Sequence, residues 1–344
     1  MKKQIERRVF LKGLLSLSAF VTGSFLSFNK NRSFKSGKIG LTEAQSMSTT
    51  GKGMKKIAVE EHCYTKEYVD WLYSSRTTFK GRELDDPVVQ RTIDRGEGRL
   101  KEMDEGGIDM QILSLSYPDL DPFNTADAIA LSRIVNDELA ETVKRNPDRF
   151  AAYCCLPLQD PEAAADELER SVTRLGLRGA MVNTIDERWM ADEKYEVLYE
   201  RLSKLNVPIY LHQTESGEHI IPDMINLIGG DFLDKYPNLH FMLGHAGEAL
   251  PFWLWRRSRS QSVDGKRSFR QKFIEHFSVT TSDQCWPELL QFLIAVMGSD
   301  RILFGTDYPY ESSRQHVDFI DSAPINRKDR ANICYRNAER VFKL

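Results

Sequence analysis

The sequence lacks the features that mark several specialised classes of protein. Its five cysteines are an odd number without regular spacing, which excludes a disulfide framework. The 47 lysines and arginines nearly balance the 50 aspartates and glutamates, so no broad basic field would recruit nucleic acid. No internal repeat and no second domain are visible. A single large domain remains, for which 41% apolar residues supply a sizeable core.

The chain also lacks an uninterrupted apolar run suited to crossing a membrane. The best candidate, residues 11–28, contains Lys12, two glycines and four serines. It follows a basic start, and RRVFLK at residues 7–12 resembles the twin-arginine export signal. We therefore expect residues 1–53 to be an export signal and flexible linker, carried by the twin-arginine machinery to the periplasm or beyond, and residues 54–344 to fold. An uncleaved membrane anchor is the alternative.

Short apolar segments alternate with amphipathic ones in the rest of the chain. The apolar segments are rich in β-formers and apolar on both faces, which is typical of buried parallel strands. There are eight: residues 57–62, 109–116, 149–158, 177–183, 207–213, 239–246, 276–282 and 301–309. The segments between them carry apolar residues at three- and four-residue spacing, as helices do.

Eight strands, each followed by a helix, predict an α/β fold of the (β/α)8 TIM-barrel type. An open doubly wound sheet is the alternative, and the count of eight favours the barrel. The one long connection, residues 63–108, follows the first strand and is rich in charge. We expect it to be a helical insertion over the mouth of the barrel.

Potential metal ligands and proton carriers stand at the ends of several predicted strands, where barrels of this kind have their active sites. Glu60 and His62 end the first strand, and their i, i+2 spacing puts both side chains on one face. His212, His245 and Asp307 end the fifth, sixth and eighth strands. Two carboxylates and two imidazoles from this set would bind one divalent cation, Zn²⁺ or Mn²⁺.

Each of these residues also has a simpler explanation. A lone histidine at a strand end is usually a satisfied core or surface residue, and Asp307 could be an ordinary turn residue. Glu60 could pair with an arginine, and Glu61 should face the barrel wall with a partner that the sequence does not name. Their joint placement favours the metal site. The remaining histidines are expected to be structural, with His219 a weaker candidate near the site: His219, His240, His276 and His316.

These residues lie in motifs that resemble the amidohydrolase superfamily, specifically its decarboxylase branch, which includes the gamma-resorcylate and 5-carboxyvanillate decarboxylases. The resemblance covers roughly residues 55–344. Its motifs are VEEH (59–62), GEGRLKEMDEGGID (96–109), GHAGE (244–248) and TDYPYE (306–311). GHAGE, with an arginine eight residues beyond its glutamate, and TDYPYE are the specific ones, because simple hydrolases of the superfamily lack that combination.

The resemblance implies roles for individual residues. The metal ligands of the family fall on Glu60, His62, His212 and Asp307. Its catalytic histidine falls on His245, paired with Glu248 one helical turn into the next helix, and these two would act with Asp307. Arg256 would bind the substrate carboxylate, and Asn183 would contact the substrate. One metal is implied, because the fourth strand ends in asparagine where binuclear members have a bridging lysine.

The resemblance also implies a function, the metal-dependent, non-oxidative decarboxylation of an ortho-hydroxy aromatic, hydroxybenzoate-like carboxylic acid. The residues can support it: Asp307, with His245 and Glu248 behind it, could protonate the ring carbon before CO2 leaves. A metal-dependent hydrolase of a lactone, ester or amide is the main alternative, and a binding protein on an inactive barrel is a weaker one. SYPDLDPFN (116–124) and residues 63–83 depart from the resorcylate enzymes. The family tends to dimers and tetramers, which predicts a homo-oligomer.

Overall fold

The computed structural model describes residues 51, 53–74, 81–183, 192–212, 220–259 and 267–344. The predicted export signal therefore lies outside the described residues, and the domain boundary at residue 53 stays a prediction. Within the described residues, no helix combines the length and the apolar character that crossing a membrane requires.

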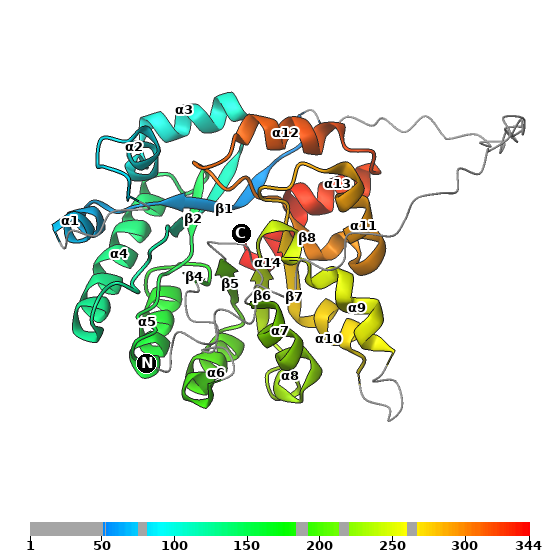
Figure 1. Ribbon diagram of the computed structural model, residues 1–344. Helices are drawn as coiled ribbons and strands as arrows, with labels where there is room; N and C mark the ends of the chain where they lie inside the picture. Colours follow the sequence, from blue (N-terminus) through cyan, green and yellow to red (C-terminus); the bar gives the residue numbers. More distant parts are fainter. Residues whose placement is uncertain (1–50, 52, 75–80, 184–191, 213–219, 260–266) are drawn as a thin grey trace, which may run out of the picture. The chain divides into compact units, whose positions relative to one another are not determined.

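Eight parallel strands follow one another in chain order around the centre of the folded unit (Figure 1). All eight predicted strands are present, most of them shorter than predicted. They are β1 (Ile57–Cys63), β2 (Met110–Leu115), β3 (Phe150–Ala152), β4 (Ala180–Asn183), β5 (Pro208–His212), β6 (His240–Leu243), β7 (Phe277–Thr280) and β8 (Ile302–Leu303).

The strands form two sheets, β1–β3 and β4–β8, which two short contacts join into a barrel. Beyond β3, the Cys154 N–H donates to the Gly179 carbonyl (2.8 Å) and the Met181 N–H donates to the Cys154 carbonyl (3.1 Å). Beyond β8, the His62 N–H donates to the Tyr308 carbonyl (2.7 Å). The sheet therefore closes on itself, and the predicted TIM barrel is confirmed over the open sheet.

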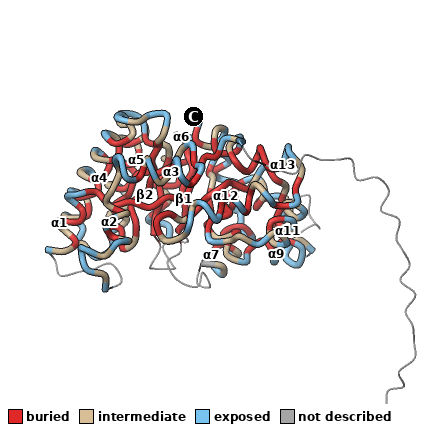
Figure 2. Tube along the Cα trace, turned by 90° about the horizontal axis from the view of Figure 1, so that it is seen from above, coloured by how far each residue is buried: buried red, intermediate tan, exposed pale blue. Residues whose placement is uncertain are grey.

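Helices surround the strands, with their buried faces turned to the barrel (Figures 1 and 2). After β2 they are α4 (Thr125–Arg145), α5 (Pro161–Thr173), α6 (Glu196–Leu205), α7 (Ile220–Gly229), α8 (Phe232–Lys235), α9 (Leu250–Ser258), α10 (Phe269–His276), α11 (Pro287–Met297), α12 (Ser313–Ser322), α13 (Arg327–Ala331) and α14 (Asn337–Phe342). Local signals set several of their ends. The Asp160 side chain accepts from the N–H groups of Glu162 and Ala163 at the start of α5, and Ser268 with Gln271 forms a capping box on α10.

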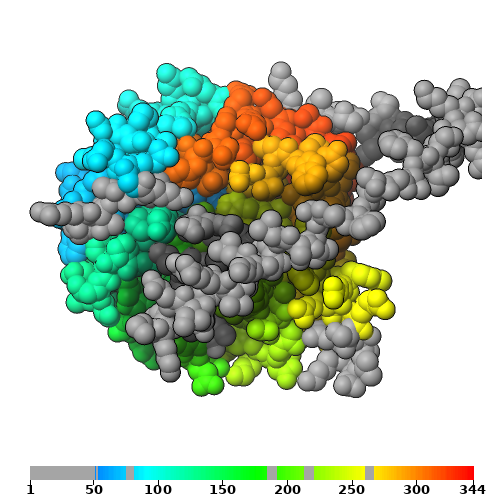
Figure 3. All heavy atoms as spheres, viewed as in Figure 1, coloured from blue at the N-terminus to red at the C-terminus, as the bar shows by residue number. Residues whose placement is uncertain are grey.

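The long connection after β1 is helical, as predicted. It contains α1 (Lys66–Ser74), α2 (Pro87–Ile93) and α3 (Glu97–Gly106). The Tyr64 N–H, just beyond β1, donates to the Thr92 carbonyl at 2.9 Å, so α2 packs at the carboxyl end of that strand. Helices α3 and α12 lie side by side (Figure 3). The insertion therefore borders the end of the barrel at which the predicted site lies.

Candidate active site

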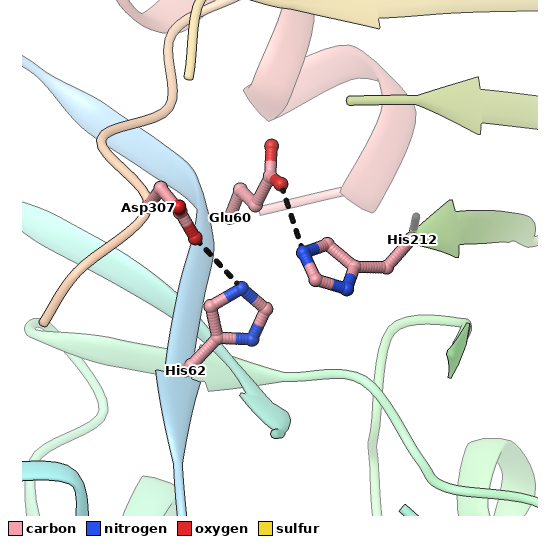
Figure 4. Close-up of side chains that lie close together, drawn as sticks. All are labelled: Glu60, His62, His212 and Asp307. Carbon is pink, nitrogen blue, oxygen red and sulfur yellow. Dashed lines mark ion pairs between the residues drawn. The ribbon is translucent and has the colours of Figure 1, made fainter. Parts of the chain in front are cut away.

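The four predicted metal ligands converge at the carboxyl ends of the strands (Figure 4). One ligand atom from each of Glu60, His62, His212 and Asp307 lies within 4.8 Å of the others. His62 Nε2 is 3.0 Å from Asp307 Oδ1, and His212 Nε2 is 3.5 Å from Glu60 Oε1. Residues 247 positions apart in the chain thus face one point in space.

Three of these atoms are buried without a hydrogen-bond partner among the described residues: Glu60 Oε1, His62 Nε2 and Asp307 Oδ1. Buried polar atoms in native proteins are nearly always satisfied, so a cluster of orphaned acceptors calls for another explanation. A divalent cation supplies one, because two carboxylates and two imidazoles are a suitable donor set for it. The residues present therefore fit a single metal ion.

Hydroxyl groups fix the Glu60 carboxylate so that only one oxygen is left for the cation. Oε2 accepts from Tyr210, from Thr280 (2.8 Å) and from Ser282, while Oε1 accepts no hydrogen bond from the described residues. Burial raises the pKa of Glu60, and His245 opposes that rise. A cation at Oε1 would oppose it further, since positive charge favours the ionised form.

His245 lies next to the four ligands and is paired with Glu248. Its Nδ1 is 2.5 Å from Glu248 Oε1, and its Nε2 is 3.4 Å from Glu60 Oε1. Burial alone would lower the pKa of His245, but Glu60, Glu248 and Asp307 outweigh it and raise the pKa to about 10. The imidazole is thus held as a proton carrier by the carboxylates that face it.

The local backbone differs from the prediction at three of these positions. His245 does not end a strand: β6 stops at Leu243, and His245 lies beyond it with a φ of 46°. Glu248 does not lie in a helix: its φ is 50° and that of Ala249 is 62°, a left-handed conformation that helices exclude, so α9 starts only at Leu250. Asp307 lies beyond β8, whose two residues end at Leu303. It also has positive φ, and its N–H donates to the Glu60 carbonyl at 3.0 Å, which places it against β1.

The architecture and the site together narrow the choice of family, and sequence comparison decides it. The family model described as amidohydrolase matches residues 68–344. The chain belongs to the amidohydrolase family. A gamma-resorcylate decarboxylase from Rhodococcus jostii (strain RHA1) is 34% identical to it, and the match covers 84% of this chain and 98% of that one.

Two solved decarboxylase structures have the same fold. The 5-carboxyvanillate decarboxylase from Sphingomonas paucimobilis superposes with a TM-score of 0.77 at 29% identity, covering 84% of this chain and 99% of that one. The dihydroxybenzoic acid decarboxylase from Polaromonas sp. JS666, with bound manganese and the inhibitor 2-nitroresorcinol, superposes with a TM-score of 0.74 at 33% identity. That match covers 84% of this chain and 97% of that one.

Sequence reasoning did not find the partners of Glu61, the acid between two ligands of this amidohydrolase. Its carboxylate accepts from the N–H and hydroxyl of Thr306 (both 2.9 Å) and from Gln111 Nε2 (2.9 Å). Gln111 Oε1 in turn accepts from Nε of the buried Arg99 at 2.7 Å. Burial raises the pKa of Glu61 to about 8, against the opposing effects of Arg99 and Thr306. The VEEH motif therefore directs Glu60 and His62 to the metal site and Glu61 to the wall, as expected.

The two predicted substrate-binding residues are placed differently from each other. Asn183 ends β4 and is buried, and its side-chain oxygen is 2.8 Å from Nδ1 of His212, so it supports a ligand of the amidohydrolase site. Arg256 lies exposed on α9, and within the described ranges no hydrogen bond or ion pair joins it to the four ligands. Contact of either residue with the substrate stays a prediction.

The remaining histidines in the described part of the chain have partners away from the four ligands, whereas one tyrosine lies beside them. His240 contacts Ser278 Oγ, and His276 and His316 contact backbone carbonyls, so these three have structural partners as expected. His219 lies outside the described residues. Tyr310, inside the TDYPYE motif but given no role from the sequence, has its ring 5.5 Å from that of His62. It is 2.6 Å from the Ser116 hydroxyl.

Proposed function

We propose that this chain is a metal-dependent, non-oxidative decarboxylase of an aromatic acid that has a hydroxyl group ortho to its carboxylate. The observation that carries the proposal is the set of three orphaned ligand atoms next to a histidine–glutamate pair. Relatedness over nearly the whole length of a gamma-resorcylate decarboxylase supports the same reaction class.

Glu60, His62, His212 and Asp307 would hold the cation. When bound, it supplies a Lewis acid that can receive the carboxylate and the neighbouring phenolic oxygen of the substrate and offset their charge. Manganese is the preferred ion, because the Polaromonas structure contains it and half of the donor set is carboxylate. Zinc is compatible with the same ligands.

The residues of the chain provide the proton. Decarboxylation requires a proton at the ring carbon that bears the carboxylate, followed by departure of CO2 and recovery of aromaticity. The Nδ1–H of His245 donates to Glu248, which leaves Nε2 facing the site. Asp307 is close enough for its charge to help raise the pKa of His245. The two groups therefore share the role of acid, and the proton belongs to the set.

The proposal is tested with Mn²⁺-loaded, metal-analysed protein that lacks residues 1–50. It is incubated with 2,6-dihydroxybenzoate, 5-carboxyvanillate, other ortho-hydroxybenzoates, benzoates without that hydroxyl, and simple lactones, while CO2 release and product mass are followed. We expect CO2 from at least one ortho-hydroxy acid and none from its counterpart without the hydroxyl. Lactone or ester cleavage without CO2 from any acid would assign the chain to the hydrolases instead.

We also propose export through the twin-arginine machinery, on the strength of RRVFLK at residues 7–12. Replacing both arginines by lysine (R7K/R8K) keeps the charge of the segment. If the proposal holds, the full chain moves to the periplasmic fraction and the double variant stays inside. Equal distribution of the two proteins would contradict it.

A homo-oligomer is a further proposal, supported by exposed aromatic side chains on neighbouring helices. Phe252 and Trp255 of α9 are 61% and 78% exposed, and Trp286 at the start of α11 is 58% exposed. The rings of Phe252 and Phe292 stack at 4.5 Å, so the two helices form one aromatic surface. Such a surface is costly in water and is typical of interfaces. Light scattering should show a smaller particle for Trp255→Glu than for the unaltered chain.

A further inference from the structure

A chain of hydrogen bonds leads away from the metal ligand His212 into the segment SYPDLDPFN. His212 Nδ1 is 2.8 Å from Asn183 Oδ1. Asn183 Nδ2 donates to Asp119 Oδ2 (3.2 Å) and to the Leu115 carbonyl (3.3 Å), and the Asn183 N–H also reaches Asp119 Oδ2 (3.4 Å). Asp119 therefore lies two steps from the cation position and makes no described contact with it.

The partners of Asn183 fix which way its side-chain amide points. Asp119 Oδ2 and the Leu115 carbonyl are both acceptors, so the NH2 group must face them. The oxygen of the amide then faces His212, and an oxygen can only accept. Nδ1 of His212 must therefore carry the ring proton, so Nε2 carries none and presents its lone pair on the side of Glu60 Oε1.

We infer that Asp119 is a positioning residue, which locks the amide of Asn183 and so holds His212 in the one tautomer that can bind a cation through Nε2. Without Asp119, the Leu115 carbonyl is the one described acceptor left for the NH2 group of Asn183, and the less restrained amide could turn over and offer that group to Nδ1. That arrangement favours the tautomer with the proton on Nε2, which cannot act as a ligand. The inference rests on the metal site of the proposed function, but not on the reaction performed there.

The surroundings of Asp119 suit this role. It is 5% exposed, its N–H donates to the Ser116 carbonyl at 3.0 Å, and its carbonyl accepts from the Tyr68 hydroxyl at 2.9 Å. Burial, with a contribution from Asp121, raises the pKa of Asp119 to about 8. A proton would reside on Oδ1, which has no hydrogen-bond partner in the described part of the chain, and Oδ2 would still accept. The acceptor is thus present in either charge state.

The test compares two substitutions of Asp119. One keeps the acceptor oxygen and the other removes it, and neither strains the backbone. Asp119 has a φ of 55°, which Asn and Gly both tolerate. Asp119→Asn keeps an acceptor oxygen for Asn183, whereas Asp119→Gly removes it without adding backbone strain. The exposed Asp121→Asn is the matched control for loss of charge in the same segment. Unfolding of each metal-free protein checks that the fold is retained.

Affinity for Mn²⁺ is measured on the full chain by titration, with free Mn²⁺ followed by electron paramagnetic resonance. We expect Asp119→Gly to weaken binding by roughly 10- to 100-fold, as loss of a ligand-orienting partner does, and Asp119→Asn and Asp121→Asn to stay within about threefold of the unaltered chain. In the Zn²⁺-loaded protein, the ¹⁵N spectrum should show His212 as the Nδ1–H tautomer in the Asn variant. Unchanged affinity in Asp119→Gly, or equal losses in the Gly and Asn variants, would overturn the inference.

A double-mutant cycle tests whether Asp119 acts through Asn183. Asn183→Ala should weaken Mn²⁺ binding by itself, and Asp119→Gly should then add nothing to it. Additive losses would mean that Asp119 acts by another route. Because no substrate is involved, a chain that binds Mn²⁺ in this way but releases no CO2 would fail the proposed function and leave the inference standing.

Discussion

The pKa values of buried histidines are shifted in opposite directions at the two ends of the barrel. At the amino end, His276 is 1% exposed and its Nδ1 faces the Leu239 carbonyl. Burial lowers the pKa of this histidine, because the neutral carbonyl does not compensate for lost water. At the carboxyl end, His245 is held among three carboxylates that raise its pKa to about 10. Placement of carboxylates, more than burial, decides which end can carry protons and metal.

The backbone shows the same contrast. Among the described residues, most non-glycine positions with positive φ follow the carboxyl ends of strands: Asp119, His245, Ala246, Glu248, Ala249, Asp283 and Asp307. The others, Asn206 and Lys343, are the C-caps of helices, where this conformation is usual. Unfavourable local conformations therefore gather where the proposed chemistry occurs, and the amino end is free to be a stable packed core.

The largest effect should come from removing one ligand of the carboxyl end. His212→Ala leaves Glu60 Oε1 and Asp307 Oδ1 as acceptors with one imidazole fewer, so we expect no stoichiometric metal by elemental analysis and no activity above background. His316→Gln is the control, since that buried histidine has the Ser312 carbonyl as its described partner. Full metal occupancy in His212→Ala would show that the ligand set is wrong.

The next largest effect should be a loss of turnover when a proton-carrying residue at the carboxyl end of the barrel is replaced. His245→Ala and Asp307→Asn should each lower turnover by at least roughly 100-fold, as losses of acid–base groups do. His245→Ala should retain its metal, because none of the four ligands is changed. The control is Glu311→Gln, which removes a carboxylate from the same loop as Asp307. Turnover near that of the unaltered chain, in either variant with metal bound, would remove the residue from the mechanism.

A smaller effect is expected from Glu248→Gln. The amide keeps an acceptor for Nδ1 of His245, at the position that the carboxylate occupies at 2.5 Å, but removes the negative charge. Since Glu248 acts through His245, we expect turnover to fall by about 10-fold with unchanged metal content. A loss as large as that of His245→Ala would make Glu248 a direct participant, and no loss would leave it a structural partner.

At the carboxyl end of the barrel, the metal ligands could be predicted from the sequence, whereas the residues that hold them in place could not. Glu60 and His62 follow from the two-residue period of a strand, and His212 from the rule that barrel sites lie at strand ends; both are local signals. The hydrogen-bond partners of Glu61 come from β2 and from the loop after β8, so their identity depends on the register of these segments against β1 in the closed barrel. Asp119 lies within the divergent segment SYPDLDPFN, but its contact with Asn183 joins residues 64 positions apart, and no sequence pattern predicts such a contact.

The smallest effect should appear at the amino end, in the pH dependence of stability. The unfolded chain holds this histidine at the ordinary pKa of about 6.5, whereas the folded chain holds His276 at a lower pKa. Below pH 6.5 the unfolded state therefore binds more protons, and the free energy of unfolding falls as the pH is lowered. His276→Gln removes that contribution, so its stability should fall less steeply between pH 7 and pH 5.

The difference in slope between the two proteins has a known upper bound, one proton or about 1.4 kcal/mol per pH unit. Denaturant unfolding at several pH values measures it, and groups common to both proteins cancel in the comparison. At pH 8 and above the titration of His276 should contribute nothing to their difference. Parallel curves would mean that the carbonyl of Leu239 stabilises the imidazolium of His276 as well as water does. Burial would then not lower the pKa at the amino end, and the two ends of the barrel would differ only in the carboxylates that surround their histidines.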